Sequence, residues 1–227
     1  MLNTECYIHA KLTGVSKIMK NIHVIDHPFM QERLHLLRSK KTSTGQFRKA
    51  VIECGEMLSY EIARNYPTTL ISVETPLEIT ESRILKMQVT IVAILRAALG
   101  LAEGLARYFP EARIGHMGLY RNEDTLKPVQ YYCNLPSDID DGHIILADPM
   151  LATGGSLVAS LDELAEFTNM KTLSIATLIA APEGIKKVSE KYPDIPIYTA
   201  AVDRELNAKG FILPGLGDAG DRQYGTF

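Results

Sequence analysis

The sequence has few of the residues that build metal sites in proteins. It contains three cysteines, Cys6, Cys54 and Cys133, and no C-x-x-C pair. This spacing argues against a structural zinc site, and free thiols fit a reducing cytoplasm. The six histidines also lack the spacing of metal ligands. We therefore expect no metal site built from protein ligands alone.

Long apolar runs and an excess of one charge are missing as well. No run approaches the roughly 18 apolar residues that a membrane span needs, and residues 1–10 lack the apolar core of a signal peptide. The 24 basic residues nearly balance the 27 acidic ones, which argues against a nucleic-acid partner. The composition, 46% hydrophobic and 22% charged, is typical of a soluble globular protein.

Several common catalytic and nucleotide-binding motifs are absent from the chain. There is no G-x-x-x-x-G-K-[ST] phosphate loop and no G-x-S-x-G nucleophile elbow, and the adjacent Gly154 and Gly155 do not fit a G-x-G-x-x-G dinucleotide fingerprint. These observations speak against P-loop nucleotide hydrolysis, a Rossmann dinucleotide site and an α/β-hydrolase.

Strands and helices alternate along most of the chain. Continuous apolar runs such as 89–95 are typical of a parallel sheet that helices cover on both faces. Residues 121–139 are polar, and we expect them to form an excursion outside the core. The pattern predicts an α/β fold with strands over 69–75, 89–95, 112–119, 143–147, 172–179 and 196–202, and helices over 29–37, 47–66, 99–108, 156–167 and 182–192.

The domain organisation follows from the same pattern. Residues 1–22 show no clear periodicity, and we interpret them as an N-terminal extension. The alternation continues from there, so residues 23–227 are expected to form a single domain.

The most informative stretch follows the apolar run Ile144–Ala147. It is a loop of nine residues, called the phosphate loop below: Asp148, Pro149, Met150, Leu151, Ala152, Thr153, Gly154, Gly155 and Ser156. A predicted helix follows it, and helix N-termini offer unpaired N–H groups and a favourable dipole to phosphates. The glycines allow close backbone approach, and the hydroxyls add donors. The alternative is a plain strand-to-helix turn with Ser156 as the N-cap.

Two arginines end predicted strands at the same edge of the sheet. Arg96 directly follows an apolar strand, where an unpaired charge is costly. We expect an anionic partner there, either pyrophosphate oxygens or a carboxylate in a structural ion pair. Arg121 opens the polar excursion, where it would either close over the same anion or remain a solvated loop residue.

The C-terminal stretch 210–226 is rich in glycine and contains one proline. Such a segment can bring backbone N–H and C=O groups close to the edge of a small flat base. Asp218 lies in it among small residues, within reach of a sugar, a pyrophosphate or its Mg²⁺. Its apolar residues argue against the alternative of a disordered tail.

Taken together, these motifs resemble the uracil phosphoribosyltransferase family. The resemblance covers the phosphate loop with Pro149 and Ala152, the hood segment 120–129, Ala181–Ile185, and the tail 214–222. It runs from about His27 to Thr226, nearly the whole chain. It implies a phosphoribosyltransferase-type, mainly parallel sheet with helices on both sides, a hood excursion and a glycine-rich C-terminal base-binding segment.

The resemblance implies that uracil and phosphoribosyl pyrophosphate (PRPP) react to UMP and diphosphate in pyrimidine salvage, with Mg²⁺ carried by PRPP. The phosphate loop would bind the ribose 5-phosphate, and Asp148 the ribose hydroxyls. Arg96 and Arg121 would contact pyrophosphate. Backbone groups of Ile212, Gly217, Asp218 and Ala219 would face uracil, with Asp218 also facing PRPP. A homodimer or homotetramer is implied too, and a GTP effector is left open.

One departure from the family pattern lies beside Arg96, where Ala98 replaces a usual glycine. The added methyl restricts φ, which would affect PRPP binding without abolishing it. Two other functions stay open at this point. The first is a degenerate phosphoribosyltransferase that senses UMP or PRPP as a regulator, and the second is a salvage enzyme for another base.

Overall fold

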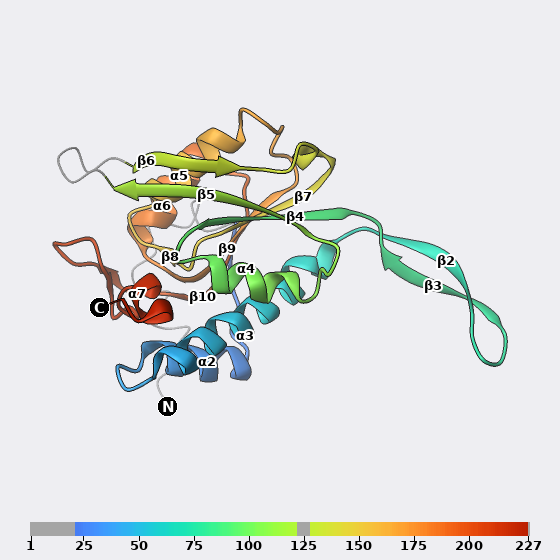
Figure 1. Cartoon of the computed structure of the whole chain (residues 1–227), viewed down its shortest axis with the longest axis horizontal. Helices are drawn as coiled ribbons and strands as arrows, with labels where there is room; N and C mark the ends of the chain where they lie inside the picture. The colour runs from blue at the N-terminus through green and yellow to red at the C-terminus, as the bar shows by residue number, and fades with distance from the viewer. Residues whose placement is uncertain (1–20, 122–127, 227) are drawn as a thin grey trace.

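The computed structural model describes residues 21–121 and 128–226. A central sheet dominates this part of the chain, with the strand order β1-β10-β9-β7-β4-β5-β6 and β8 added on β9 (Figure 1). Every pair is parallel except β5 with β6. The strands are β1 (Ile22–Val24), β4 (Gln88–Leu95), β5 (Arg113–Arg121), β6 (Pro128–Asn134), β7 (Gly142–Ala147), β8 (Met150–Leu151), β9 (Leu173–Ala180) and β10 (Ile197–Val202).

Helices cover both faces of this sheet. One face packs against α2, α3 and α4, and the other against α5 and α6 (Figure 1). In β4, Ile91 and Ala93 face the first group, whereas Val92 and Ile94 face the second. Because both faces of β4 are covered by helices, residues 89–95 are apolar almost without interruption. The helices are α2 (Pro28–Arg38), α3 (Thr44–Ile62), α4 (Leu99–Ala106), α5 (Gly155–Leu164) and α6 (Pro182–Lys191), with short 3-10 turns η1 (Ala63–Asn65) and η2 (Ile139–Asp141).

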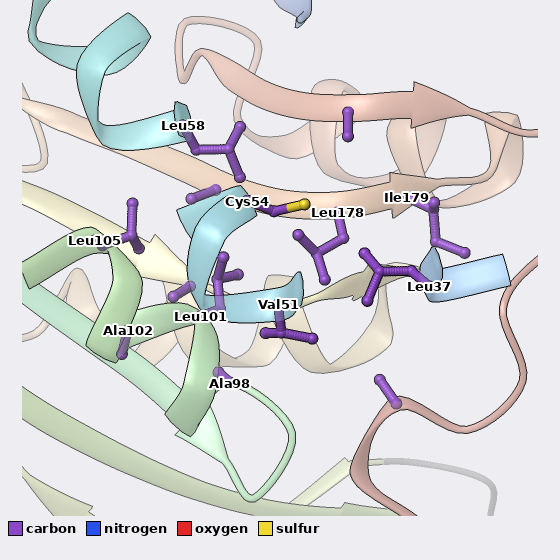
Figure 2. Close-up of a cluster of buried hydrophobic side chains, with 14 of the residues drawn as sticks. Leu37, Val51, Cys54, Leu58, Ala98, Leu101, Ala102, Leu105, Leu178 and Ile179 are labelled. Carbon is purple, nitrogen blue, oxygen red and sulfur yellow. The ribbon is translucent and has the colours of Figure 1, made fainter. Parts of the chain in front are cut away.

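The first core lies where α3 crosses α4 over the sheet. Figure 2 shows Leu37, Val51 and Leu58 beside Leu101 and Leu178 in this cluster. The two helices approach closely through glycines, since a Cβ on Gly104 would lie only 2.0 Å from the carbonyl oxygen of Ile52. Any side chain at Gly104 would therefore push α4 away from α3.

Most predicted elements are confirmed, with ends shifted by a few residues. The turn before α3 supplies the N-cap Ser43, which forms a capping box with Gln46. The α/β class with a mainly parallel sheet is confirmed too.

Two regions differ from the sequence expectation. Residues 128–134 were expected outside the core, but they form β6, which pairs with β5 as the antiparallel edge of the sheet. The predicted strand 69–75 is present as β2 (Thr68–Glu74), but it pairs with a strand that was not predicted, β3 (Ile79–Leu85), in a hairpin separate from the main sheet. Figure 1 shows this hairpin reaching far from the rest of the molecule. The predicted extension falls mostly on residues 1–20, outside the described part.

The C-terminal stretch is ordered as two small elements. A short ladder pairs β11 (Glu205–Leu206) with β12 (Ile212–Leu213), and α7 (Ala219–Tyr224) follows. The helix α7 packs beside α3 and is bonded to the turn after β4, where Gln223 donates a hydrogen bond to the Ala97 carbonyl oxygen. None of the helices in the described residues is long and apolar enough to cross a membrane.

Candidate active site

The sequence-predicted residues leave the sheet at one common edge. Ala93 in β4 pairs with Ala147 in β7, and Leu95 pairs with Gly118 in β5. Arg96 and Asp148 therefore follow the carboxyl ends of neighbouring strands, where ligands of parallel sheets bind. Arg121 is the last residue of β5, on the same edge. Its side chain belongs to the part of the chain that the structure does not describe.

The first half of the phosphate loop is bonded into the sheet. The carbonyl oxygen of Pro149 accepts hydrogen bonds from the N–H groups of Leu178 (3.0 Å) and Ile179 (3.2 Å). Met150 and Leu151 form β8, and the carbonyl oxygen of Leu151 accepts from Ala181 N–H. Leu151 is 1% exposed, so its side chain supports the loop from below and does not reach a ligand.

The second half of the loop turns outward into α5. Gly154 is the N-cap of α5 with φ of +74°, a conformation that favours glycine. Ser156 lies inside the first turn, so the alternative of a plain turn with Ser156 as the N-cap does not describe this loop. Thr153 and Ser156 are exposed, and the Thr153 hydroxyl accepts a hydrogen bond from Gly155 N–H. The hydroxyls and the helix N-terminus together form an anion-binding arrangement.

Lys187 in α6 is a further cation beside this loop, and the sequence analysis missed it. A Cβ placed on Gly155 would lie 3.8 Å from the Lys187 ammonium nitrogen. α6 reaches the loop because Gly184 has no side chain: a Cβ there would lie 2.3 Å from the Ala152 carbonyl oxygen. In the sequence, α5 and β9 lie between the loop and Lys187, so no local motif could have indicated this lysine.

Asp148 lies at the base of the loop. It is half-buried, and its Oδ1 atom accepts a hydrogen bond from Met150 N–H over 3.2 Å. Burial raises the pKa of its carboxyl to about 6, against the weaker opposing effect of that hydrogen bond. The carboxylate is therefore poised to gain from hydroxyl donors of a sugar, which would stabilise its charged form.

Arg96 meets α7 at the other side of the site. Its Nη2 atom lies 3.5 Å from Asp221 Oδ1 and 3.4 Å from Thr226 Oγ1, and its guanidinium lies over the Tyr224 ring. The side chain is 56% exposed. The sequence argument, that burial forces an anionic partner, therefore does not hold, although a carboxylate is indeed nearby.

The predicted base-binding residues lie on the turn from β12 to α7, called the base segment below (residues 212–219). Ile212 and Ala219 are almost fully buried, so their side chains do not reach a ligand. Gly217 has a φ of +81°, which favours glycine. Asp218 is exposed, and its side chain caps α7 by accepting from Asp221 N–H.

The buried side chain of Gln223 joins the base segment to the turn that follows Arg96. Its Nε2 atom donates to the carbonyl oxygens of Ala97 (2.7 Å) and Ala219 (3.2 Å). Gly220 brings the same parts together, since a Cβ there would lie 3.3 Å from Asp218 Oδ1 and 4.0 Å from Arg96 Nη2. Arg96, Asp218 and the base segment thus share one corner of the site.

The described residues hold no group of three or more histidine, cysteine, aspartate or glutamate side chains that could bind a metal ion. Mg²⁺ commonly keeps several waters and takes only one or two carboxylates when substrate phosphates also bind it. The residues present therefore fit a Mg²⁺ ion that arrives with a phosphorylated ligand, with Asp218 as an exposed carboxylate in the right corner.

Comparisons with known proteins identify the family of the chain. The family model described as uracil phosphoribosyltransferase matches residues 24–226. The uracil phosphoribosyltransferase of Salinibacter ruber is 48% identical over 208 residues, which cover 92% of this chain and 99% of the relative. That of Brevibacillus brevis is 49% identical over 209 residues, with 92% and 100% covered.

Solved structures give the same picture. The AQ2163 protein from Aquifex aeolicus is 37% identical and superimposes with a TM-score of 0.84, covering 89% of this chain and 97% of its own. A hypoxanthine-guanine phosphoribosyltransferase from Bacillus anthracis is 16% identical with a TM-score of 0.50, over 70% and 80% of the two chains, and supports the fold alone. By its sequence over nearly the whole length, the chain belongs to the uracil phosphoribosyltransferase family.

Proposed function

We propose that the protein transfers the phosphoribosyl group of PRPP to uracil, giving UMP and diphosphate. The observation that carries this proposal is the position of Arg96. Arg96 follows the carboxyl end of β4, between Asp148 of the phosphate loop and the base segment. Gln223 bonds the turn after Arg96 to the base segment, through the carbonyl oxygens of Ala97 and Ala219. PRPP has three parts, a 5-phosphate, a ribose and a pyrophosphate, and this edge of the sheet offers a complementary group for each.

The roles of the residues follow from their chemistry. The N-terminus of α5, with the Thr153 and Ser156 hydroxyls and the nearby Lys187, binds the 5-phosphate. Asp148 accepts hydrogen bonds from the ribose hydroxyls. Arg96 and Arg121 bind pyrophosphate, a ligand that suits the planar guanidinium. Backbone groups of Ile212, Gly217, Asp218 and Ala219 bind the edge of uracil.

In the reaction, N1 of uracil forms a bond to C1′ of the ribose, while the bond from C1′ to the pyrophosphate oxygen breaks. The N1 proton passes to solvent. Positive charge develops on the ribose and negative charge on the leaving group, so Asp148 and Arg96 act mainly through electrostatics. Mg²⁺ bound to PRPP would neutralise further charge on the leaving pyrophosphate.

We also propose that two copies of the chain associate through the β2–β3 hairpin. Ile71, Val73 and Ile84 lie on one face of it, because alternate residues and cross-strand partners share a face. They are 40%, 38% and 44% exposed. A two-stranded hairpin is marginal in isolation, and exposed apolar side chains on it favour a partner.

Two finer proposals concern regulation and location. A GTP effect on activity is proposed from family resemblance alone, and adding GTP to the assay below tests it. A cytoplasmic location is supported by Cys54 and Cys133, which are free thiols.

The deciding experiment measures UMP formation from radiolabelled uracil, PRPP and Mg²⁺. Guanine, hypoxanthine and adenine replace uracil as controls. We expect UMP only with uracil. Turnover of another base would overturn the uracil assignment. Tight binding of UMP and PRPP without turnover would indicate a sensor instead of an enzyme.

A further inference from the structure

A charged pair outside the proposed substrate contacts holds the middle of the base segment. Arg38 is the last residue of α2, and Asp203 follows β10. The two side chains meet through two parallel hydrogen bonds, Nη1 to Oδ2 over 2.9 Å and Nη2 to Oδ1 over 2.5 Å. The Asp203 side chain is 4% exposed and that of Arg38 is 26% exposed. This two-point geometry fixes orientation as well as distance.

The same pair binds both backbone groups of Gly215. Asp203 Oδ2 accepts a hydrogen bond from Gly215 N–H, and Arg38 Nη1 donates one to the Gly215 carbonyl oxygen, each over 2.9 Å. Gly215 has a φ of +68°, and a Cβ there would lie 2.2 Å from the Ile212 carbonyl oxygen. The pair therefore fixes the one turn that sets Ile212 relative to Gly217.

A second arginine anchors the neighbouring residue to the same helix end. Arg222 donates to the carbonyl oxygens of Leu216 (2.7 Å) and Ser39 (2.6 Å), and also to that of Leu37. Its guanidinium lies 4.3 Å from the centre of the Phe47 ring. Residues 215 and 216 are thus both tied to the C-terminal end of α2, a favourable place for cations.

We propose that Arg38 and Asp203 are positioning residues for uracil: they hold the base segment in the conformation that binds the base, without touching the base themselves. This inference rests on the proposed function, because it assumes that the base segment binds uracil. Since the phosphate loop is bonded separately to β9 and α6, loss of the pair should weaken uracil binding far more than PRPP binding.

The test compares Asp203→Asn and Arg38→Met with the wild-type protein. We expect the KM for uracil to rise about tenfold or more, because a lost bond to a charged group commonly has this effect. The Kd for PRPP, measured by calorimetry without uracil, should stay within about twofold. Arg113→Met is the matched control, because Arg113 also bonds both the carboxylate and the carbonyl oxygen of one residue, Asp138, away from the site. Its uracil KM should not change.

A merely structural role would give a different result. It would lower thermal stability while leaving the ratio of the two substrate constants unchanged, and that outcome would overturn the proposal. Arg38→Lys guards against variants that do not fold, since it keeps the charge but loses the two-point geometry. We expect it to fold and to show an intermediate rise in uracil KM; an unchanged KM in folded Arg38→Lys and Asp203→Asn protein would reject the inference.

Hydrogen exchange separates this inference from the proposed function. The Gly215 amide should exchange faster in Asp203→Asn than in wild type, whether or not the enzyme makes UMP. If the wild-type protein makes no UMP, the proposed function fails, while the exchange rate of the Gly215 amide still shows whether the Arg38–Asp203 pair holds the base segment. If wild type makes UMP and the exchange rate and uracil KM are both unchanged in the variant, the positioning role is wrong.

Discussion

Arg96 and Asp221 form a loose ion pair, with 3.5 Å between Nη2 and Oδ1 and with side chains that are 56% and 38% exposed. An exposed pair of this kind contributes little to stability. The guanidinium can therefore exchange this carboxylate for a pyrophosphate without a large cost in free energy. The pair keeps Arg96 at the rim of the site in the absence of a ligand.

Arg96→Met should accordingly separate binding from stability. We expect the KM for PRPP to rise by about ten- to a hundredfold, because a charge-assisted bond to the leaving group is lost. The free energy of unfolding should change by less than about 1 kcal/mol. Steady-state kinetics and urea unfolding measure the two quantities. A large loss of stability with unchanged PRPP kinetics would assign Arg96 a structural role.

Asp148→Asn should remove most turnover while leaving the fold intact. The amide keeps the size of the side chain but loses the charge that holds the ribose hydroxyls and stabilises developing positive charge. A loss of about 10²-fold in kcat/KM corresponds to one such charged interaction. Near-normal UMP formation by the variant would refute the role of Asp148.

The same variant should be more stable than wild type at neutral pH. The carboxyl pKa is raised from 3.8 to about 6 in the fold, so the ligand-free folded state holds its proton more tightly than the unfolded state does. Wild-type stability therefore falls as pH rises from about 4 to 6, by up to about 3 kcal/mol. Unfolding of both proteins at pH 4 and pH 7.5 checks this: the difference should appear only at the higher pH.

Ala98→Gly should leave PRPP affinity unchanged and lower stability. Ala98 has a φ of −80° and is fully buried among core residues, as Figure 2 shows. Its methyl therefore packs in the core and imposes no strained conformation. Removing it should cost about 1 kcal/mol in the free energy of unfolding. Titration with PRPP and thermal unfolding measure both effects; a large loss of affinity would mean that the methyl shapes the substrate site.

The proposed association through the β2–β3 hairpin can be tested by substitutions on its apolar face. Ile71→Glu combined with Val73→Glu should convert an oligomer into monomers, because two charges would be placed on the apolar face. Sedimentation velocity measures the change. Phe167→Glu, at a side chain that is 52% exposed elsewhere, should leave the assembly unchanged. An identical mass for all three proteins would rule out the hairpin as the contact.

Local patterns predicted the parts of the site that are contiguous in sequence. The continuous apolar run of β4 and the glycine-rich turn before α5 each report on a single element, and both predictions are confirmed. β6 was missed because Pro128 and its polar neighbours resemble a loop, and an edge strand needs few apolar residues. Contacts such as Arg38 with Asp203 join residues 165 positions apart, and no local pattern encodes them.

The bonding of Pro149 and Leu151 to β9 and α6 has a consequence for substrate binding. The first half of the phosphate loop is held in one conformation by hydrogen bonds within the protein, because its carbonyl groups are bonded to the sheet and to Ala181. The entropy loss of ordering that backbone therefore belongs to folding and does not weaken the association with PRPP. Selection for rapid phosphate capture can then act on the side chains around the loop, independently of its backbone.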